Sequence, residues 1–161
     1  MAIQIRVIRA CLKQSLFIHT EYNSVCIRRI CAGSFLFTVR RISEYCFYED
    51  LDYSDQDANH LLLYKDNKLI GYSRAFSPGI KYDAASIGRI VIDLEYRGKG
   101  YGKSITQESI QFLNSNFPES DITISAQYRL IDFYEDQGFK REGSVYLEDD
   151  IEHIKMTLKS K

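Results

Sequence analysis

The sequence is poor in tryptophan, proline and cysteine. It contains no tryptophan, two prolines and four cysteines among 161 residues. The cysteines all lie in the first third of the chain, and they form neither a CxxC pair nor a Cys/His spacing typical of metal ligands. We therefore expect a reduced, cytoplasmic protein with no metal site.

The chain also lacks a strong net charge and a long hydrophobic run. Its formal net charge is −1, so no overall electrostatic attraction draws it to nucleic acid or to an anionic membrane. No apolar run approaches the roughly 20 residues that span a bilayer. Neither nucleic acid nor a membrane is therefore an expected partner.

Residues 1–34 form an atypical basic segment. From Met1 to Ser43 there are seven lysines and arginines and a single acid, Glu21. Such a composition occurs in organelle transit peptides, and it also suits a basic strand and helix that cover one edge of a domain. No repeat or linker separates this segment from the rest, so residues 1–161 are expected to form a single domain.

Strand and helix patterns alternate through the rest of the chain. A polar turn at residues 65–68 between two β-prone runs predicts a hairpin, and Gly138 predicts a left-handed helix end. Expected strands cover residues 60–64, 69–76, 87–92, 122–126 and 154–158, and expected helices cover 102–116 and 130–137. This order predicts an α/β layer with a sheet covered on both faces.

A glycine-rich loop joins the strand at residues 87–92 to the helix that follows. Glycines at positions 98, 100 and 102 let the backbone approach a ligand closely, and they direct amide N–H groups toward one point. The N-terminus of the helix adds partial positive charge, and Arg97, Lys99 and Lys103 add full charges. The loop therefore suits a pyrophosphate, although a glycine loop that only turns a strand into a helix has the same local pattern.

Two commoner phosphate motifs do not fit this loop. A Walker A loop that ends in Gly102-Lys103-Ser104 requires glycine at position 97, where this chain has Arg97. The dinucleotide fingerprint requires G-x-G-x-x-G, whereas these glycines are spaced two and two. A nucleotide-binding protein that uses magnesium is therefore a lesser alternative.

The loop Arg97-Gly98-Lys99-Gly100-Tyr101-Gly102 resembles the R/Q-x-x-G-x-G/A loop of the GCN5-related N-acetyltransferases (GNAT family), which holds the pyrophosphate of acetyl-CoA. The strand at 88–92 and the segment Phe133 to Phe139 resemble the splayed fourth strand and the F-Y-x-x-x-G-F helix of that family. Judged by the segments 87–91, 126–127 and 146–154, residues 35–158 resemble the ElaA-like branch of the family most. Two departures lie on the acceptor side, at 41–45 and at 148–153. The resemblance implies the GNAT fold, an α+β domain with a mixed, mostly antiparallel sheet of six to seven strands and helices on both faces.

The resemblance further implies an enzyme that moves the acetyl group of acetyl-CoA directly to a primary amine. A bulge in the strand at 90–92 would free backbone N–H groups to polarise the thioester carbonyl. Tyr134 aligns with the family tyrosine that meets the sulfur, so we expect it to act as general acid, although a core tyrosine on a helix is the simpler alternative. The expected cofactor-binding residues are Ile90, Val91, Ile92, Arg97, Gly98, Lys99, Gly100, Tyr101, Gly102, Lys103 and Ser104.

The acceptor side is less defined by the sequence. An attacking ammonium must lose a proton, and His153 is the expected base because the resemblance places its segment beside the acceptor cleft. The further acceptor-side candidates are Glu44, His60, Glu148 and Asp150. Acidic clusters at 49–57 and 148–152, in expected loops, would steer a cationic amine inward if they line the cleft.

The identity of the partner molecules stays open at this level. The acceptor is a small-molecule or a protein amine, and a homodimer is a fair expectation for such a small enzyme. A non-catalytic acyl-CoA-binding module on the same fold is the alternative function, since the acceptor-side motifs depart from the family.

Overall fold

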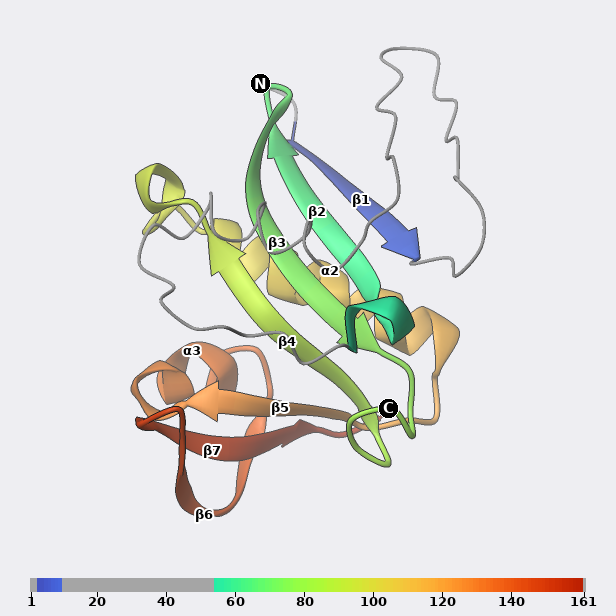
Figure 1. Cartoon of the computed structure of the whole chain (residues 1–161), viewed down its shortest axis with the longest axis vertical. Helices are drawn as coiled ribbons and strands as arrows, with labels where there is room; N and C mark the ends of the chain where they lie inside the picture. The colour runs from blue at the N-terminus through green and yellow to red at the C-terminus, as the bar shows by residue number, and fades with distance from the viewer. Residues whose placement is uncertain (1–2, 10–53, 161) are drawn as a thin grey trace.

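A mixed seven-stranded sheet organises the protein, as seen in a computed structural model that describes residues 3–9 and 54–160 (Figure 1). The strand order is β1-β2-β3-β4-β5-β7-β6, and all neighbours are antiparallel except β4 and β5. The strands are β1 Ile3–Arg9, β2 Asn59–Lys65, β3 Lys68–Phe76, β4 Ala85–Ile92, β5 Ile122–Gln127, β6 Lys140–Glu148 and β7 Ile151–Leu158. The mixed, mostly antiparallel sheet expected from the sequence is confirmed.

Two α-helices lie among the described residues, with three short 3-10 turns. The α-helices are α2 Tyr101–Asn116 and α3 Ile131–Glu135, and the turns are η1 Ser54–Asp57, η2 Leu94–Tyr96 and η3 Tyr128–Leu130. The helix expected at 130–137 is therefore shorter, because residues 128–130 form a separate 3-10 turn. Gly138 follows α3 with a φ of 94°, so the expected left-handed helix end is confirmed.

The expected hairpin at residues 60–76 is formed by β2 and β3. Its turn consists of Asp66 and Asn67, with φ angles of 48° and 64°. Asp and Asn tolerate this left-handed conformation, which matches the twist of a two-residue hairpin turn. The basic β1 pairs with β2 and forms one edge of the sheet, where Figure 1 draws it in blue. The rest of the basic segment, residues 10–34, lies outside the described residues.

One large apolar core joins both helices to the sheet. It is built from side chains of β4, β5 and β7, together with Leu113 of α2 and Tyr134 of α3. On β5 and β7 the alternating positions Ile124, Ala126, Ile154 and Met156 face this core. The intervening positions of the same strands must face the opposite side of the sheet.

Candidate functional site

The sheet opens between its two parallel strands. β4 and β5 pair at only two positions, Ala85 with Ile122 and Ser86 with Thr123. Beyond these positions the strands run apart, and Figure 1 shows β4 and β5 diverging from their common end. In the described sheet, the β5 side of β4 thus has no strand partner after Ser86. This divergence leaves the backbone of residues 87–92 available to a ligand.

A β-bulge lies in the same stretch of β4. The register with β3 shifts between Tyr72, which faces Val91, and Arg74, which faces Gly88. Arg89 has a φ of 51°, a left-handed conformation that is unusual for a residue with a side chain. A bulge leaves backbone groups outside the ladder and redirects them, often at functional sites. A bulge is therefore present in β4, but it lies at residues 89–90 rather than at the expected 90–92, because Val91 and Ile92 pair again with Tyr72 and Gly71.

The glycine loop follows β4 and leads into α2. Gly98 and Gly100 have φ angles of 69° and 85°, and an added Cβ at either position would meet no atom within 4 Å. Gly100 is the residue that precedes the first turn of α2. The first N–H groups of an α-helix have no acceptor within the helix. The loop thus has the open backbone space and the amide donors that a pyrophosphate requires.

The basic residues of the loop are held close to its backbone. The Arg97 Nε donates to the carbonyl oxygen of Ile92 at 2.9 Å, and the Lys99 Nζ donates to that of Glu95 at 2.7 Å. Lys103 is exposed on the first turn of α2. The Ser104 hydroxyl donates to the carbonyl of Gly100 at 3.3 Å and so closes the first turn of the helix.

A basic and aromatic cluster beside the loop was not anticipated from the sequence. The ammonium groups of Lys65 and Lys99 lie 5.6 Å from the centre of the Tyr96 ring, and that of Lys65 lies 5.5 Å from the ring of Tyr101. A hydrogen bond with Tyr101 raises the pKa of Lys65. Lys65 belongs to the β2–β3 hairpin, so only the tertiary fold brings its charge to the loop.

Tyr134 is a buried member of the main core. Its side chain is 8% exposed, and its ring makes edge-to-face contacts with Phe133 and Phe139. Burial raises the pKa of Tyr134 to about 12. The hydroxyl therefore stays protonated throughout the neutral range, as a proton or hydrogen-bond donor must.

His153 lies on β7, on the side of the sheet opposite the core. Its Nδ1 lies 2.9 Å from the carbonyl oxygen of Ile151, which can only accept a hydrogen bond. In the neutral ring Nδ1 must then carry the proton, so Nε2 is left with a lone pair. The ring stacks on Tyr146 of β6, with centroids 6.2 Å apart. His153 is thus held in the tautomer that a base requires.

Glu148 joins a polar cluster on the same side of the sheet. It accepts a hydrogen bond of 2.7 Å from the hydroxyl of Ser125, and that hydroxyl also contacts the Tyr146 hydroxyl. Glu148 and His153 of the sequence prediction are therefore brought together through Tyr146. Neither Ser125 nor Tyr146 has a local motif, and only the pairing of β5, β7 and β6 places them beside Glu148.

The comparisons with known proteins agree with this geometry. Residues 33–160 match the family described as the acetyltransferase (GNAT) domain. The chain belongs to this family. A UPF0039 protein of Synechocystis is 35% identical over 116 residues, which are 71% of this chain and 75% of the relative. ElaA of Escherichia coli is 29% identical over 117 residues, which are 71% of this chain and 76% of ElaA.

Solved structures show the same GNAT fold. The crystal structure of Escherichia coli ElaA has a TM-score of 0.76 and 23% identity, and the match covers 98% of this chain and 100% of ElaA. An acyl-CoA N-acyltransferase from Pseudomonas aeruginosa has a TM-score of 0.76 and 24% identity, with 98% and 99% coverage. A GNAT acetyltransferase from Elizabethkingia anophelis with acetyl-CoA bound has a TM-score of 0.62 and 14% identity, with 98% and 97% coverage.

Apart from His60, the remaining acceptor-side candidates lie in the β6–β7 turn or outside the described residues. Asp150 is exposed in the two-residue turn between β6 and β7, with a φ of 60°. Glu148 and Glu152, expected in a loop, belong to strands, because the loop is reduced to Asp149 and Asp150. Glu44 and residues 49–53 lie outside the described residues.

His60 is fully buried. Its side chain is 0% exposed, its Nε2 lies 3.0 Å from the carbonyl oxygen of Asp55, and its Nδ1 lies 2.8 Å from the Tyr72 hydroxyl. The Asp55 carboxylate pairs with Arg74 at 2.7 Å, so this acid of the 49–57 cluster is neutralised inside the fold. His60 has no exposed surface with which to contact an acceptor, and this placement gives it a structural role.

The stability of the protein should fall in mild acid because of His60. Burial lowers the pKa of His60, so the folded state binds this proton less tightly than the unfolded chain does. This contribution of His60 to the free energy of unfolding is complete above about pH 6.5, the ordinary pKa of histidine. It is lost as the pH falls from that value toward the lower pKa of His60 in the folded state. Urea unfolding of the wild type and of His60→Gln between about pH 7.5 and 5 measures this effect. A parallel decline in both proteins would contradict it.

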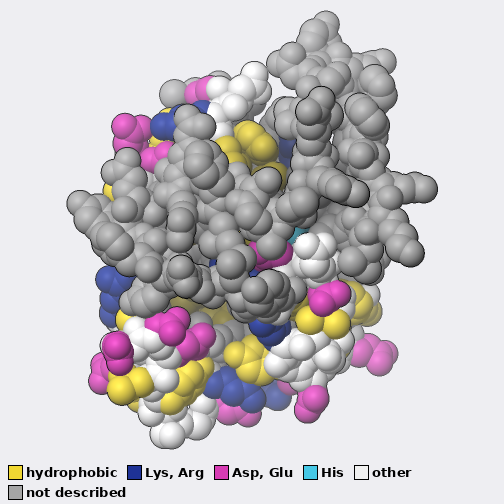
Figure 2. Space-filling view, viewed as in Figure 1, with side chains coloured by type: hydrophobic (Ala, Val, Ile, Leu, Met, Phe, Trp, Pro, Cys, Tyr) yellow, Lys and Arg dark blue, Asp and Glu magenta, His cyan; other side chains and the backbone are white. Residues whose placement is uncertain are grey.

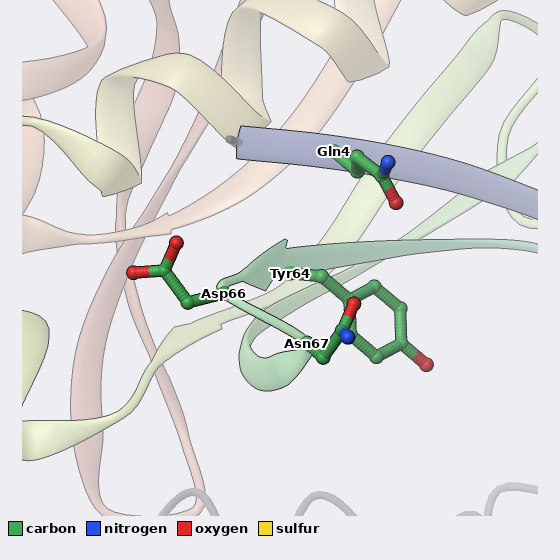
Figure 3. A pocket seen from close by; sticks show the side chains of 4 residues that line it. All are labelled: Gln4, Tyr64, Asp66 and Asn67. Carbon is green, nitrogen blue, oxygen red and sulfur yellow. The ribbon is translucent and has the colours of Figure 1, made fainter. Parts of the chain in front are cut away.

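Two surface hollows are lined by none of the site residues predicted from the sequence. One is lined by Gln4, Tyr64, Asp66 and Asn67 at the β2–β3 turn, where the Asp66 carboxylate points away from the Tyr64 ring (Figure 3). The other runs along α2 beside Gln137. Within residues 3–9 and 54–160 no group of acidic, histidine or cysteine side chains is arranged to hold a metal ion. No helix in the described part of the chain is long and apolar enough to cross a membrane.

Proposed function

We propose that this GNAT protein transfers the acetyl group of acetyl-CoA directly to a primary amine. The observation that carries this proposal is the coincidence, on one strand, of the opening toward β5, the bulge at Arg89 and the glycine loop after Ile92. A thioester lying along the free side of β4 would present its carbonyl to the bulge, while its pyrophosphate would lie on the loop. The exposed loop geometry at Gly98 and Gly100 supports this fit.

Each end of the reaction has a candidate group. Backbone N–H groups of residues 90–92 stabilise the negative charge that develops on the thioester oxygen. The amine attacks the carbonyl carbon, the carbon–sulfur bond breaks, and the departing sulfur receives a hydrogen bond from Tyr134. A thiol loses its proton near pH 8.5, far below the pKa of about 12 for Tyr134, so stabilisation of the sulfur by this hydrogen bond is favoured over complete proton transfer.

The base and the hydrogen-bond donor to the sulfur lie on opposite sides of the sheet. Tyr134 belongs to the core side, together with Ile124 and Ala126, whereas His153 lies on the other side. An ammonium that approaches from the His153 side gives its proton to Nε2, and the neutral amine then attacks the face of the planar thioester carbonyl that is turned toward it. This arrangement supports direct transfer without an acyl-enzyme intermediate.

Turnover measurements test this proposal. Purified protein, acetyl-CoA and a panel of small amines and peptides with free amino groups are mixed, and free CoA thiol is measured. We expect thiol release that requires both the protein and an amine. Binding of acetyl-CoA without thiol release across the panel would contradict the proposal and favour a non-catalytic acyl-CoA-binding module.

A further inference from the structure

The polar face of the β5-β7-β6 unit carries a cluster of oxygen atoms from two strands far apart in the chain. Ser125 comes from β5, and Tyr146 and Glu148 come from β6. Tyr146 is 39% exposed. Figure 2 shows hydrophobic and acidic side chains gathered over this end of the molecule, at the lower left.

The donor of each hydrogen bond in this cluster follows from the number of hydrogens that each group carries. The Ser125 hydroxyl has one hydrogen, which it donates to the Glu148 Oε2 at 2.7 Å. The Tyr146 hydroxyl must therefore donate its hydrogen to Ser125. The second carboxylate oxygen of Glu148 and the remaining lone pair of Tyr146 are left as hydrogen-bond acceptors.

Among the residues that the structure describes, no lysine or arginine forms an ion pair with Glu148, whereas Glu142 on the same strand pairs with Lys155 at 3.1 Å. The cluster thus combines a carboxylate that has no cationic partner among the described residues with the exposed aromatic ring of Tyr146, a combination that suits an organic cation.

We propose that Glu148 and Tyr146 bind a second cationic group of the acceptor. The acceptor class is then a primary amine that carries another ammonium or guanidinium group on the same molecule. This inference rests on the proposed acetyl transfer and on His153 as the base. Because the His153 ring stacks on Tyr146, the second cation binds about one ring away from the reacting nitrogen, so a short chain joins the two groups.

Ser125 acts in this proposal as a positioning residue. Its hydroxyl holds the Glu148 carboxylate toward Tyr146, so Ser125→Ala should raise KM for a dicationic acceptor and change kcat much less. If Ser125 were merely structural, Ser125→Ala would instead change kcat/KM equally for a dicationic acceptor and for a monocationic acceptor of the same length.

The test compares two acceptors of equal length, diaminobutane and butylamine, with acetyl-CoA at saturation. We expect the wild type to prefer the diamine in kcat/KM by about tenfold or more, the size expected for hydrogen bonds to a charged partner. In Glu148→Gln this preference should fall to within about twofold, because an amide attracts an ammonium much less than a carboxylate does. Glu152→Gln is the matched control, since Glu152 is exposed and lies one position away on β7, pointing to the other face.

The first two outcomes below bear on the dicationic-acceptor inference alone, and the third bears also on acetyl transfer. Equal kcat/KM for both amines in the wild type would overturn the inference and leave acetyl transfer standing. An equal loss of preference in Glu148→Gln and Glu152→Gln would also overturn it, because a general charge effect would then explain the selectivity. Transfer to neither amine would overturn the inference for small acceptors and would count against the proposed function as well.

Discussion

Gly100→Glu should abolish measurable acetyl-CoA binding in a domain that stays folded. The new side chain would place a negative charge where the pyrophosphate lies on the loop, at a position where an added Cβ meets no atom within 4 Å. Loss of charge-assisted hydrogen bonds to two phosphates predicts a weakening of about a hundredfold or more. Isothermal titration calorimetry with acetyl-CoA measures it.

Gly79→Glu is the matched control for this variant. Gly79 has a φ of 83°, close to the 85° of Gly100, and its Cβ would also meet no atom within 4 Å. Both substitutions therefore carry a similar cost of about 1–2 kcal/mol for a side chain in the left-handed region. Equal melting temperatures with binding lost only in Gly100→Glu would support the assignment. An unchanged dissociation constant in Gly100→Glu would show that the loop does not hold the pyrophosphate.

Tyr134→Phe should lower kcat by about 10²- to 10³-fold, the usual cost of losing one hydrogen-bond donor to a developing charge, while acetyl-CoA affinity stays nearly constant. The hydroxyl is needed only as charge develops on the sulfur, and phenylalanine keeps the ring contacts with Phe133 and Phe139. Single-turnover acetyl transfer is the appropriate measurement, because slow product release can hide a chemical defect. Tyr128→Phe provides the control, since Tyr128 is 43% exposed beside the same helix.

The pH dependence gives a second test of Tyr134. A donor must keep its proton, and with a pKa of about 12 Tyr134 keeps it across the neutral and mildly alkaline range. The wild-type rate should therefore show no alkaline loss attributable to Tyr134 below about pH 11. A single-turnover rate of Tyr134→Phe within about twofold of the wild type would show that water or another group, and not Tyr134, stabilises the departing sulfur.

The cofactor side of the site could be predicted because its signals are local. The strand before the loop, the three spaced glycines and the helix after them are contiguous, and the structure has all three in that order. The turn at Asp66 and Asn67 was equally predictable, since short polar residues tolerate a positive φ.

The acceptor side could not be predicted in the same way because its contacts join distant strands. The strand β6 has no hydrophobic alternation, and all nine of its residues are exposed at the edge of the sheet. Because β6 cannot be recognised from the sequence, no sequence pattern connects Ser125 with Tyr146 and Glu148. The burial of His60 depends on partners such as Tyr72, twelve residues away, so its sequence alone did not distinguish a structural from a binding histidine.

Transfer of an isotope-labelled acetyl group from acetyl-CoA tests the central claim most directly. Wild-type protein, labelled acetyl-CoA and an amine acceptor are incubated, and the masses of both the acceptor and the intact protein are measured. We predict that the label appears on the acceptor nitrogen in step with CoA release, and that the protein stays unmodified. Label that accumulates on the protein, or acetyl-CoA binding without any labelled acceptor, would contradict direct acetyl transfer at this site.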